Sequence, residues 1–472
     1  MAYSKKPTYS FENANSNGIN KVPQGRIVVV ESYEGTAKSF MSGDTSSLQD
    51  TSTIKEAVTQ GKLTELSAAE ESLNQTKVLT PGKLGFGCGV CSTELAKEKG
   101  LTGMPGYESV DSPNYGNYQD KEGSVFVFIP KFYFKWDKNK VLISDTEQSG
   151  YVIHRAFINA GKELDGFFIG KYQMSANGLS KKNVAAWGNQ YGYTYLAKAQ
   201  EKNNTLSKSQ YTIINIFMFN ALAILAKAQS QAGRNAAWMD VPPYLPKGCN
   251  NNSGSDVNDS SVRFTGSQPA NCGSGVPFAK TTHNGQNCGV ADLNGNVWEF
   301  ALGITCDGAK FYYVKESTDF TKFVHTVGTG ASNAVQHAWG DTAYLNNPNG
   351  FYEELSTTGI PYGGSSTYVK YGNADNQVFP FTTDKKDQKY VQCCAGIPFT
   401  SGSMNGSSAG TEEFGNDDIR GANAKTNHLM IGLGGDYGNP SVGGVFTQDL
   451  NGSRTYSYRA YGSRLAILWW MA

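Results

Sequence analysis

The stretch of sequence that decides the fold is Val290-Ala-Asp-Leu-Asn-Gly-Asn-Val-Trp-Glu-Phe300. Its Asn294-Gly295 dipeptide readily adopts positive φ angles and therefore predicts a tight turn. The aromatic and β-branched residues that follow predict a strand carrying one large indole and one carboxylate. We expect Trp298 to be buried close to Gly434. A buried carboxylate at Glu299 needs a cationic partner, because an unpaired buried charge is strongly destabilising.

Further segments stand in a fixed order around this stretch. Strands are predicted at Val125–Trp136, where Pro130 marks an edge or bend, and at Asp165–Met174. A helix is predicted over Tyr211–Gln229, where apolar residues recur with a spacing of four. Near the end of the sequence come Leu433-Gly-Gly-Asp-Tyr437 and Tyr461-Gly-Ser-Arg464. The candidate partners of Glu299 in this last part are Arg454 and Arg464.

Together these segments resemble the C-type-lectin-like fold of the formylglycine-generating-enzyme, or sulfatase-modifying-factor, superfamily. Residues 292–299 are similar to its D-x-N-G-N-V-W-E-W signature, and residues 167–174 to F-Y-I-G-K-Y-E-V, with Gln173 in place of Glu. The resemblance covers roughly residues 125–470. It implies an α+β, C-type-lectin-like domain over 81–472, with long loop insertions at about 240–285 and 303–427. The structural residues that it implies are Asn294, Gly295, Trp298, Glu299, Gly434, Gly435, Arg454 and Arg464.

The catalytic groups of the enzymatic relatives are missing. Those enzymes carry paired cysteines after the Gly-Gly segment, whereas no cysteine stands between Gly434 and Arg464. Thiolate chemistry requires a thiolate, so we expect no enzymatic activity and no bound copper or iron. The histidines form no H-x-x-x-H pair that would indicate a metal site; they are His154, His283, His325, His337 and His428. Asp417-Asp418 is compatible with a structural Ca²⁺ site or with a solvated acidic loop.

Residues 436–461 read DYGNPSVGGVFTQDLNGSRTYSYRAY, a segment rich in Tyr, Ser, Asn, Asp and Thr but without Lys, Glu, Met or Trp. This composition resembles the variable regions of phage tropism determinants that are diversified by retroelements. Tyrosine offers a large amphipathic contact at low entropic cost, as in antibody paratopes. An ordinary polar strand-and-loop region is the other interpretation. The ligand-binding candidates are Asp436, Tyr437, Asn439, Ser441, Thr447, Asp449, Asn451, Thr455, Tyr456, Ser457, Tyr458 and Tyr461. If Thr455–Tyr461 forms a strand, every second side chain faces outward and the others pack inward.

The function that we expect is that of a bacteriophage tail-fibre or tail-tip receptor-binding protein, which recognises a glycan or a protein on the host cell surface. The alternatives are an enzyme of the same superfamily with a non-standard site and a structural virion decoration protein. Residues 1–52 are expected to attach to other tail proteins of the virion, with one strand near Val28. Residues 53–80 are expected to form a helical neck, whose apolar stripe is compatible with a homotrimer.

Composition bears on the location and the partners of the chain. The 41 basic and 41 acidic residues cancel, which removes the electrostatic case for a nucleic-acid partner. No segment approaches ~18 uninterrupted apolar residues, so insertion into a membrane is not expected. No apolar region of the kind found in signal peptides follows the first residues. We therefore expect synthesis in the host cytoplasm and assembly into a virion that is extracellular after release. The eight cysteines are expected to be mainly free, buried thiols.

Overall fold

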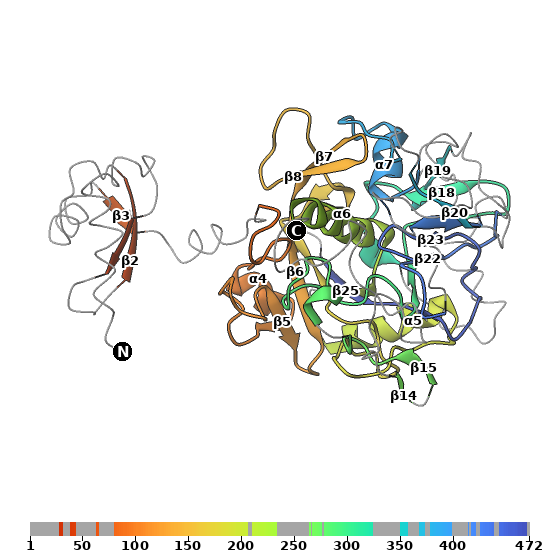
Figure 1. Cartoon of the computed structure of the whole chain (residues 1–472), viewed down its shortest axis with the longest axis horizontal. Coiled ribbons are helices and arrows are strands. Elements are labelled where there is room, and N and C mark those ends of the chain that lie inside the picture. Colours follow the sequence, from red (N-terminus) through yellow and green to blue (C-terminus); the bar gives the residue numbers. More distant parts are fainter. Residues whose placement is uncertain are drawn as a thin grey trace. The chain divides into compact units, whose positions relative to one another are not determined.

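The computed structural model divides the chain into two units, Met1–Gln75 and Thr76–Ala472 (Figure 1). In the first unit it describes three strands, and in the second it describes most of the chain. The described residues of the second unit are 80–205, 210–233, 264–265, 267–275, 278–323, 350–356, 368–372, 378–398, 414, 417–421, 425–438 and 443–469.

The described strands of the first unit form an antiparallel sheet in the order β1–β2–β3. They are β1 (Val28–Glu31), β2 (Lys38–Gly43) and β3 (Leu63–Glu65). The strand predicted near Val28 is confirmed. The prediction of a helical neck is wrong at Leu63–Glu65. These residues form strand β3, which pairs with β2 so that Thr64 lies opposite Ser42. Pairing with a neighbouring strand overrides the weak apolar stripe on which the helix prediction rested. The other residues of the predicted neck up to Gln75 lie outside the described part of the chain.

A six-stranded sheet carries the beginning and the end of the second unit. Its strands lie in the order β13 (Gln210–Ile213), β25 (Leu465–Leu468), β12 (Gly166–Gly170), β6 (Val125–Pro130), β5 (Asn117–Asp120) and β4 (Leu101–Gly103). Pro130 is the last residue of β6, because proline cannot donate to the ladder, and the chain bends there into the next strand. The central strands β12 and β6 are buried on both faces, which explains their unbroken apolar runs.

Helix α6 (Ile216–Gly233) lies in the middle of the core and packs against α7, β8 and β22 (Figure 1). It begins five residues later than predicted, because Tyr211–Ile213 pairs with β25 as strand β13. The β-branched Thr212, Ile213 and Ile214 favour the extended conformation. Asn215 then caps the helix, since its side-chain oxygen accepts a hydrogen bond from the Met218 N–H at 2.9 Å.

A second six-stranded sheet carries the decisive stretch. Its strands lie in the order β20 (Tyr368–Lys370), β21 (Asp418–Arg420), β23 (Gln448–Asp449), β22 (Ile431–Leu433), β16 (Trp298–Ala301) and β24 (Tyr461–Gly462). Strand β16 runs antiparallel to β22 and parallel to β24, with Glu299 opposite Leu433 on one side and Gly462 on the other. The turn at Asn294-Gly295 thus leads into a central strand of this sheet.

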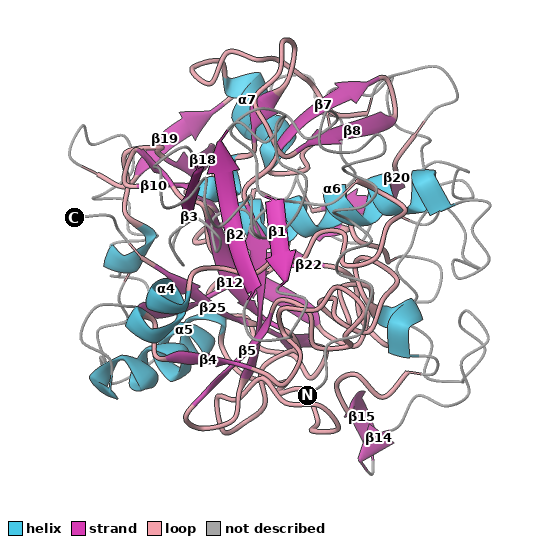
Figure 2. Cartoon of the chain, turned by 90° about the vertical axis from the view of Figure 1, so that its left-hand side faces the viewer, coloured by secondary structure: helices cyan, strands magenta, loops and turns pink. Residues whose placement is uncertain are grey.

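The remaining described elements cover these sheets (Figure 2). Two three-stranded sheets are formed by β8 (Lys140–Ser144), β7 (Tyr133–Asp137) and β9 (Val152–Ile153), and by β17 (Ile304–Cys306), β18 (Phe311–Val314) and β19 (Tyr352–Leu355). Two hairpins are β10 (Ile158–Asn159) with β11 (Lys162–Glu163), and β14 (Phe264–Thr265) with β15 (Ser267–Ala270). The short α-helices are α4 (Thr93–Glu98), α5 (Gly192–Gln200) and α7 (Gln388–Cys394). Single 3₁₀ turns are η3 (Arg155–Phe157), η4 (Glu201–Thr205), η6 (Phe278–Thr281) and η7 (Phe320–Lys322).

The described part of 303–427 contains short regular elements between its loops and turns, which the prediction of a loop-rich insertion did not place. This range supplies β17–β19, helix α7, the edge strand β20 of the second large sheet and its neighbour β21. The reason is its aromatic content: side chains such as Phe311, Tyr312 and Tyr352 are buried in the main core. Few helices and many short strands make the chain a mixed α+β protein.

Candidate binding face

The turn before β16 is held in an unusual backbone conformation. Asp292, Gly295 and Asn296 have φ angles of 59°, 94° and 67°, a region that favours glycine and tolerates Asn and Asp. The Gly295 N–H donates to the Gly434 carbonyl at 2.9 Å, and Gly434 and Gly435 also have positive φ. Burial raises the pKa of Asp292 to about 6, although the Gly273 N–H donates to its carboxylate at 2.6 Å. The expectation that Trp298 is buried near Gly434 is confirmed, since its side chain is fully buried and its strand pairs with β22.

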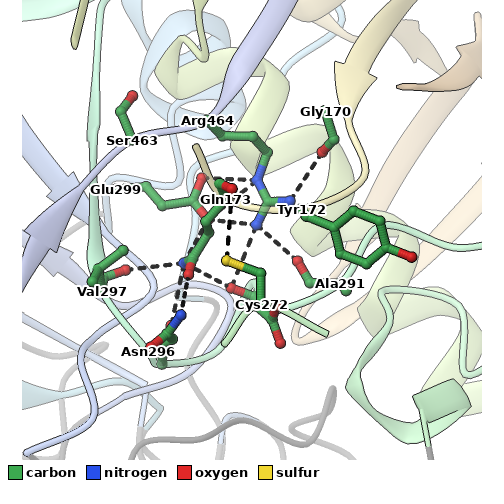
Figure 3. Close-up of polar contacts among 12 residues, drawn as sticks. Gly170, Tyr172, Gln173, Cys272, Ala291, Asn296, Val297, Glu299, Ser463 and Arg464 are labelled. Atoms are coloured by element: carbon green, nitrogen blue, oxygen red, sulfur yellow. Dashed lines mark hydrogen bonds and ion pairs between the residues drawn. The ribbon is translucent and has the colours of Figure 1, made fainter. Parts of the chain in front are cut away.

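Glu299 pairs with Arg464 rather than with Arg454 (Figure 3). The Arg464 Nη2 lies 2.6 Å from Glu299 Oε1, and its Nε lies 3.0 Å from Oε2. The same guanidinium donates to the carbonyls of Gly170 and Ala291 at 2.9 and 2.7 Å. Both partners are fully buried, so this ion pair ties β16, β12 and the last strands together. Arg454 is also buried, and its Nη2 lies 2.7 Å from His428 Nδ1.

Gln173 completes this buried cluster (Figure 3). Its side-chain amide donates to Glu299 Oε1 at 3.0 Å and to the carbonyls of Asp292 and Val297 at 3.1 and 3.2 Å. Its oxygen accepts a hydrogen bond from the Asn296 amide at 2.8 Å. A glutamine therefore fits this position as a donor to several acceptors, and it adds no second negative charge beside Glu299.

A second cluster of buried side chains surrounds the ring of Trp298. The rings of Trp298 and Tyr461 stack with their centroids 6.0 Å apart, and the indole Nε1 donates to Asp436 Oδ2 at 3.0 Å. The Tyr461 hydroxyl donates to Asp449, which also forms an ion pair with Arg420. Burial raises the pKa of Tyr461 well above its ordinary value, and the Asp449 charge raises it further. These groups hold the sheet together rather than facing solvent.

Five of the twelve ligand-binding candidates are therefore placed wrongly by the sequence. The buried ones are Asp436, Tyr437, Thr447, Asp449 and Tyr461. Thr447 and Asp449 are buried because they lie next to and in β23, an inner strand between β21 and β22. Asp436 and Tyr461 are buried through their contacts with the Trp298 ring. Asn439 and Ser441 lie outside the described residues, and Asn451 and Thr455 are half-buried.

Among the described residues of the segment, Gly438 and the run Tyr456, Ser457, Tyr458 and Arg459 are exposed. The predicted alternation of inward and outward side chains is wrong here, because these residues form turns and loops and the strand starts only at Tyr461. Tyr456 and Tyr458 are 41% and 44% exposed. The Tyr456 ring rests edge-on against the buried Tyr461 ring at 5.2 Å.

A second segment runs beside this loop. The Asn189 N–H donates to the Tyr458 carbonyl at 3.0 Å, and the Tyr193 N–H donates to the Arg454 carbonyl at 3.4 Å. Between them, Tyr191 is 38% exposed and stacks on Tyr193 with the ring centroids 5.4 Å apart. We call the exposed residues Tyr191, Tyr456, Ser457, Tyr458 and Arg459 the tyrosine face. The sequence analysis missed Tyr191 and Arg459, although the run Tyr191-Gly-Tyr-Thr-Tyr195 carried the same aromatic signal.

The tyrosine face combines aromatic and cationic groups. The Arg459 guanidinium lies over the Tyr458 ring, 5.9 Å from its centroid. Among large apolar and aromatic side chains of the described residues, these three tyrosines are the exposed aromatic ones. Tyrosine and arginine are the residues that most often anchor protein interfaces.

The described thiols are buried in the fold. The seven described cysteines are free and buried, which confirms the prediction for them: Cys88, Cys91, Cys272, Cys288, Cys306, Cys393 and Cys394. Burial lowers the pKa of His154 and of His283 to about 3, so both are neutral over the physiological range. In the described part of the chain no three acidic, cysteine or histidine side chains are placed to hold a metal ion.

The Asp417-Asp418 pair is not a solvated acidic loop. Both side chains are buried, and Asp418 Oδ2 lies 3.3 Å from Lys370 Nζ. Asp417 accepts a hydrogen bond from the Phe446 N–H at 3.1 Å. Burial raises the pKa of Asp418 to about 7. The two carboxylates fix the edge strands of the second large sheet.

Comparison with known proteins adds no name to this geometry. The chain matches no model of a protein family, and a search of curated proteins gives no match either. Among the described residues, no helix has the length and the apolar character needed to cross a bilayer.

Proposed function

We propose that the chain is a receptor-binding protein of a bacteriophage tail fibre or tail tip, and that its tyrosine face contacts a ligand on the host cell surface. The observation that carries the proposal is the exposure of Tyr456 and Tyr458 above a rigid base. Tyr456 rests on Tyr461, which in turn stacks on the buried Trp298. A ring held in this way loses little conformational freedom on binding, which favours affinity.

The resemblance to C-type-lectin-like tropism determinants supports the same proposal. In this view the first 52 residues attach to the virion and the tyrosine face lies on the receptor-binding domain. Variation by a retroelement would be confined to the exposed residues around Thr455–Arg459. The buried Asp449 and Tyr461 hold the Arg420 side chain through hydrogen bonds and charge, so their replacement would disturb the sheet.

Several copies on one particle would convert weak binding by one face into tight adsorption. We include a homotrimer in the proposal. Light scattering of the purified full-length chain should give three times the mass of one chain.

Competition for host cells tests the proposed function. Purified chain should bind saturably to the bacterial strains that support growth of the phage encoding it, and it should slow adsorption of that phage in a dose-dependent manner. A purified, folded chain that neither binds those cells nor slows adsorption would contradict the proposal and would favour a structural role in the virion.

A further inference from the structure

A cavity of about 450 Å³ lies away from the tyrosine face, between η3, the β10–β11 turn, β18, β19 and helix α7. In Figure 2, β10, β18, β19 and α7 lie in the upper left part of the view. The volume falls within the ~300–1,000 Å³ that is typical of small-molecule sites. The lining includes Arg155, Tyr313, Lys315, Glu316, Ser317 and Glu353, together with Lys385 and Lys386 in the turn before α7.

The most unusual residue of this cavity is Arg155. Its side chain is 1% exposed, and its guanidinium lies over the Phe217 ring at 5.1 Å. It donates to the carbonyl of Ile158 and, at 2.9 Å, to that of Lys315. A guanidinium has five N–H donors, and two protein carbonyls do not neutralise its charge. None of the described carboxylates forms an ion pair with it. The Glu316 carboxylate of the same lining acts on the Arg155 charge only from beyond ion-pair distance. Because a buried guanidinium charge that is not paired at close range is costly, a bound anion at the cavity would stabilise it.

The other charges of the lining narrow the ligand class. Lys315, Lys385 and Lys386 join Arg155 as cations, against the two carboxylates Glu316 and Glu353, so the net charge of the lining is +2. Lys385 also pairs with Glu163, outside the lining, at 3.6 Å, which leaves +1 once this pair is counted. The lysines favour an anion. The carboxylates accept hydrogen bonds and donate none when ionised, so they favour a ligand that also carries hydroxyl donors. A bare phosphate would be repelled by them.

We propose that this cavity binds a carboxylated sugar, such as a uronic or sialic acid, with its carboxylate toward Arg155 and the lysines and its hydroxyls toward Glu316 and Glu353. The site is separate from the tyrosine face and does not depend on the proposed function of that face. It would give the chain a second, charge-dependent contact with acidic polysaccharide.

Titration calorimetry of the full-length chain tests the proposal, with glucuronate and N-acetylneuraminate as probes and glucose, inorganic phosphate and glycine as comparisons. At least one of the two acidic sugars should bind at least tenfold more tightly than each comparison, and its binding should weaken as salt is added, because the contact is between charges. Equal binding of glucose, tighter binding of phosphate or glycine, or no binding of either acidic sugar would overturn it.

Variants locate the binding in this cavity. Ser317→Trp fills the cavity from an exposed position and should abolish binding, and Lys386→Ala should weaken it about tenfold, as expected for the loss of one charged contact. Lys140→Ala, which removes an exposed lysine elsewhere on β8, and Tyr456→Ala, on the tyrosine face, should bind as wild type does. Wild-type affinity in a folded Ser317→Trp variant would show that the sugar binds elsewhere.

Discussion

Replacing Glu299 by Gln keeps the shape of the side chain and removes the charge that neutralises Arg464. Arg464 is fully buried and has its shortest contact, 2.6 Å, with Glu299. Removing one partner of a buried ion pair costs about 3–5 kcal/mol. For a unit of about 400 residues, the unfolding entropy of ~2.1 cal/mol/K per residue sums to roughly 0.8 kcal/mol/K. The expected fall in Tm is therefore about 4–6 °C.

The matched control is Glu354→Gln, which breaks the ion pair with Lys310. The distance between Lys310 Nζ and Glu354 Oε2 is similar, 2.8 Å, but both side chains are about half exposed. Exposed pairs contribute little to stability, so this variant should shift Tm by about 1 °C or less. Differential scanning calorimetry of both variants measures the contrast. If Glu299→Gln lowers Tm no more than Glu354→Gln does, the buried pair is not the central support that we describe.

Three further predictions concern the buried polar groups. His154 has its pKa lowered by burial from 6.5 to about 3, so the unfolded chain takes up a proton below pH 6.5 and the folded chain does not until about pH 3. The stability advantage of wild type over His154→Gln, measured by urea unfolding, should therefore fall by about 2 kcal/mol from pH 7.5 to pH 5; an advantage that does not change with pH would contradict this. Gln173→Glu should destabilise the fold by at least about 2 kcal/mol, because it turns a donor toward Glu299 and two carbonyls into an acceptor, and unfolding curves that match wild type would argue against it. The seven described cysteines should react with a thiol reagent only after denaturation, and fast labelling of the native chain would show that they are accessible.

The surroundings of Trp298 could be predicted from the sequence, because the turn and strand signals are strong and because a buried carboxylate needs a cationic partner. The Asn294-Gly295 turn, the buried Trp298 and an arginine partner for Glu299 all follow from local residue chemistry. Local residue chemistry did not predict which of Arg454 and Arg464 pairs with Glu299. The choice depends on the parallel pairing of β16 with β24, which places Gly462 opposite Glu299 and brings Arg464 to the carboxylate.

The binding face was predicted less well, because composition does not distinguish a buried tyrosine from an exposed one. Tyr461 and Tyr456 are five residues apart in the same tyrosine-rich segment, yet one stacks on Trp298 in the core and the other covers it from outside. The difference arises from the strand order of the second sheet. Likewise, the start of α6 was set by pairing of β13 with β25, a contact between distant segments.

The measurement that tests the account most directly is the affinity of the purified chain for host cells after Tyr456→Ala and Tyr458→Ala are combined. Each anchoring tyrosine in an interface contributes about 2 kcal/mol or more, so the double variant should bind at least ~100-fold more weakly even when the two effects are not additive. Its Tm should stay within about 2 °C of wild type, because the two tyrosines are 41% and 44% exposed and neither belongs to the buried core. Leu142→Ala, a control of similar exposure on β8, should bind as wild type does. Wild-type affinity in the folded double variant would contradict the claim that the tyrosine face recognises the host.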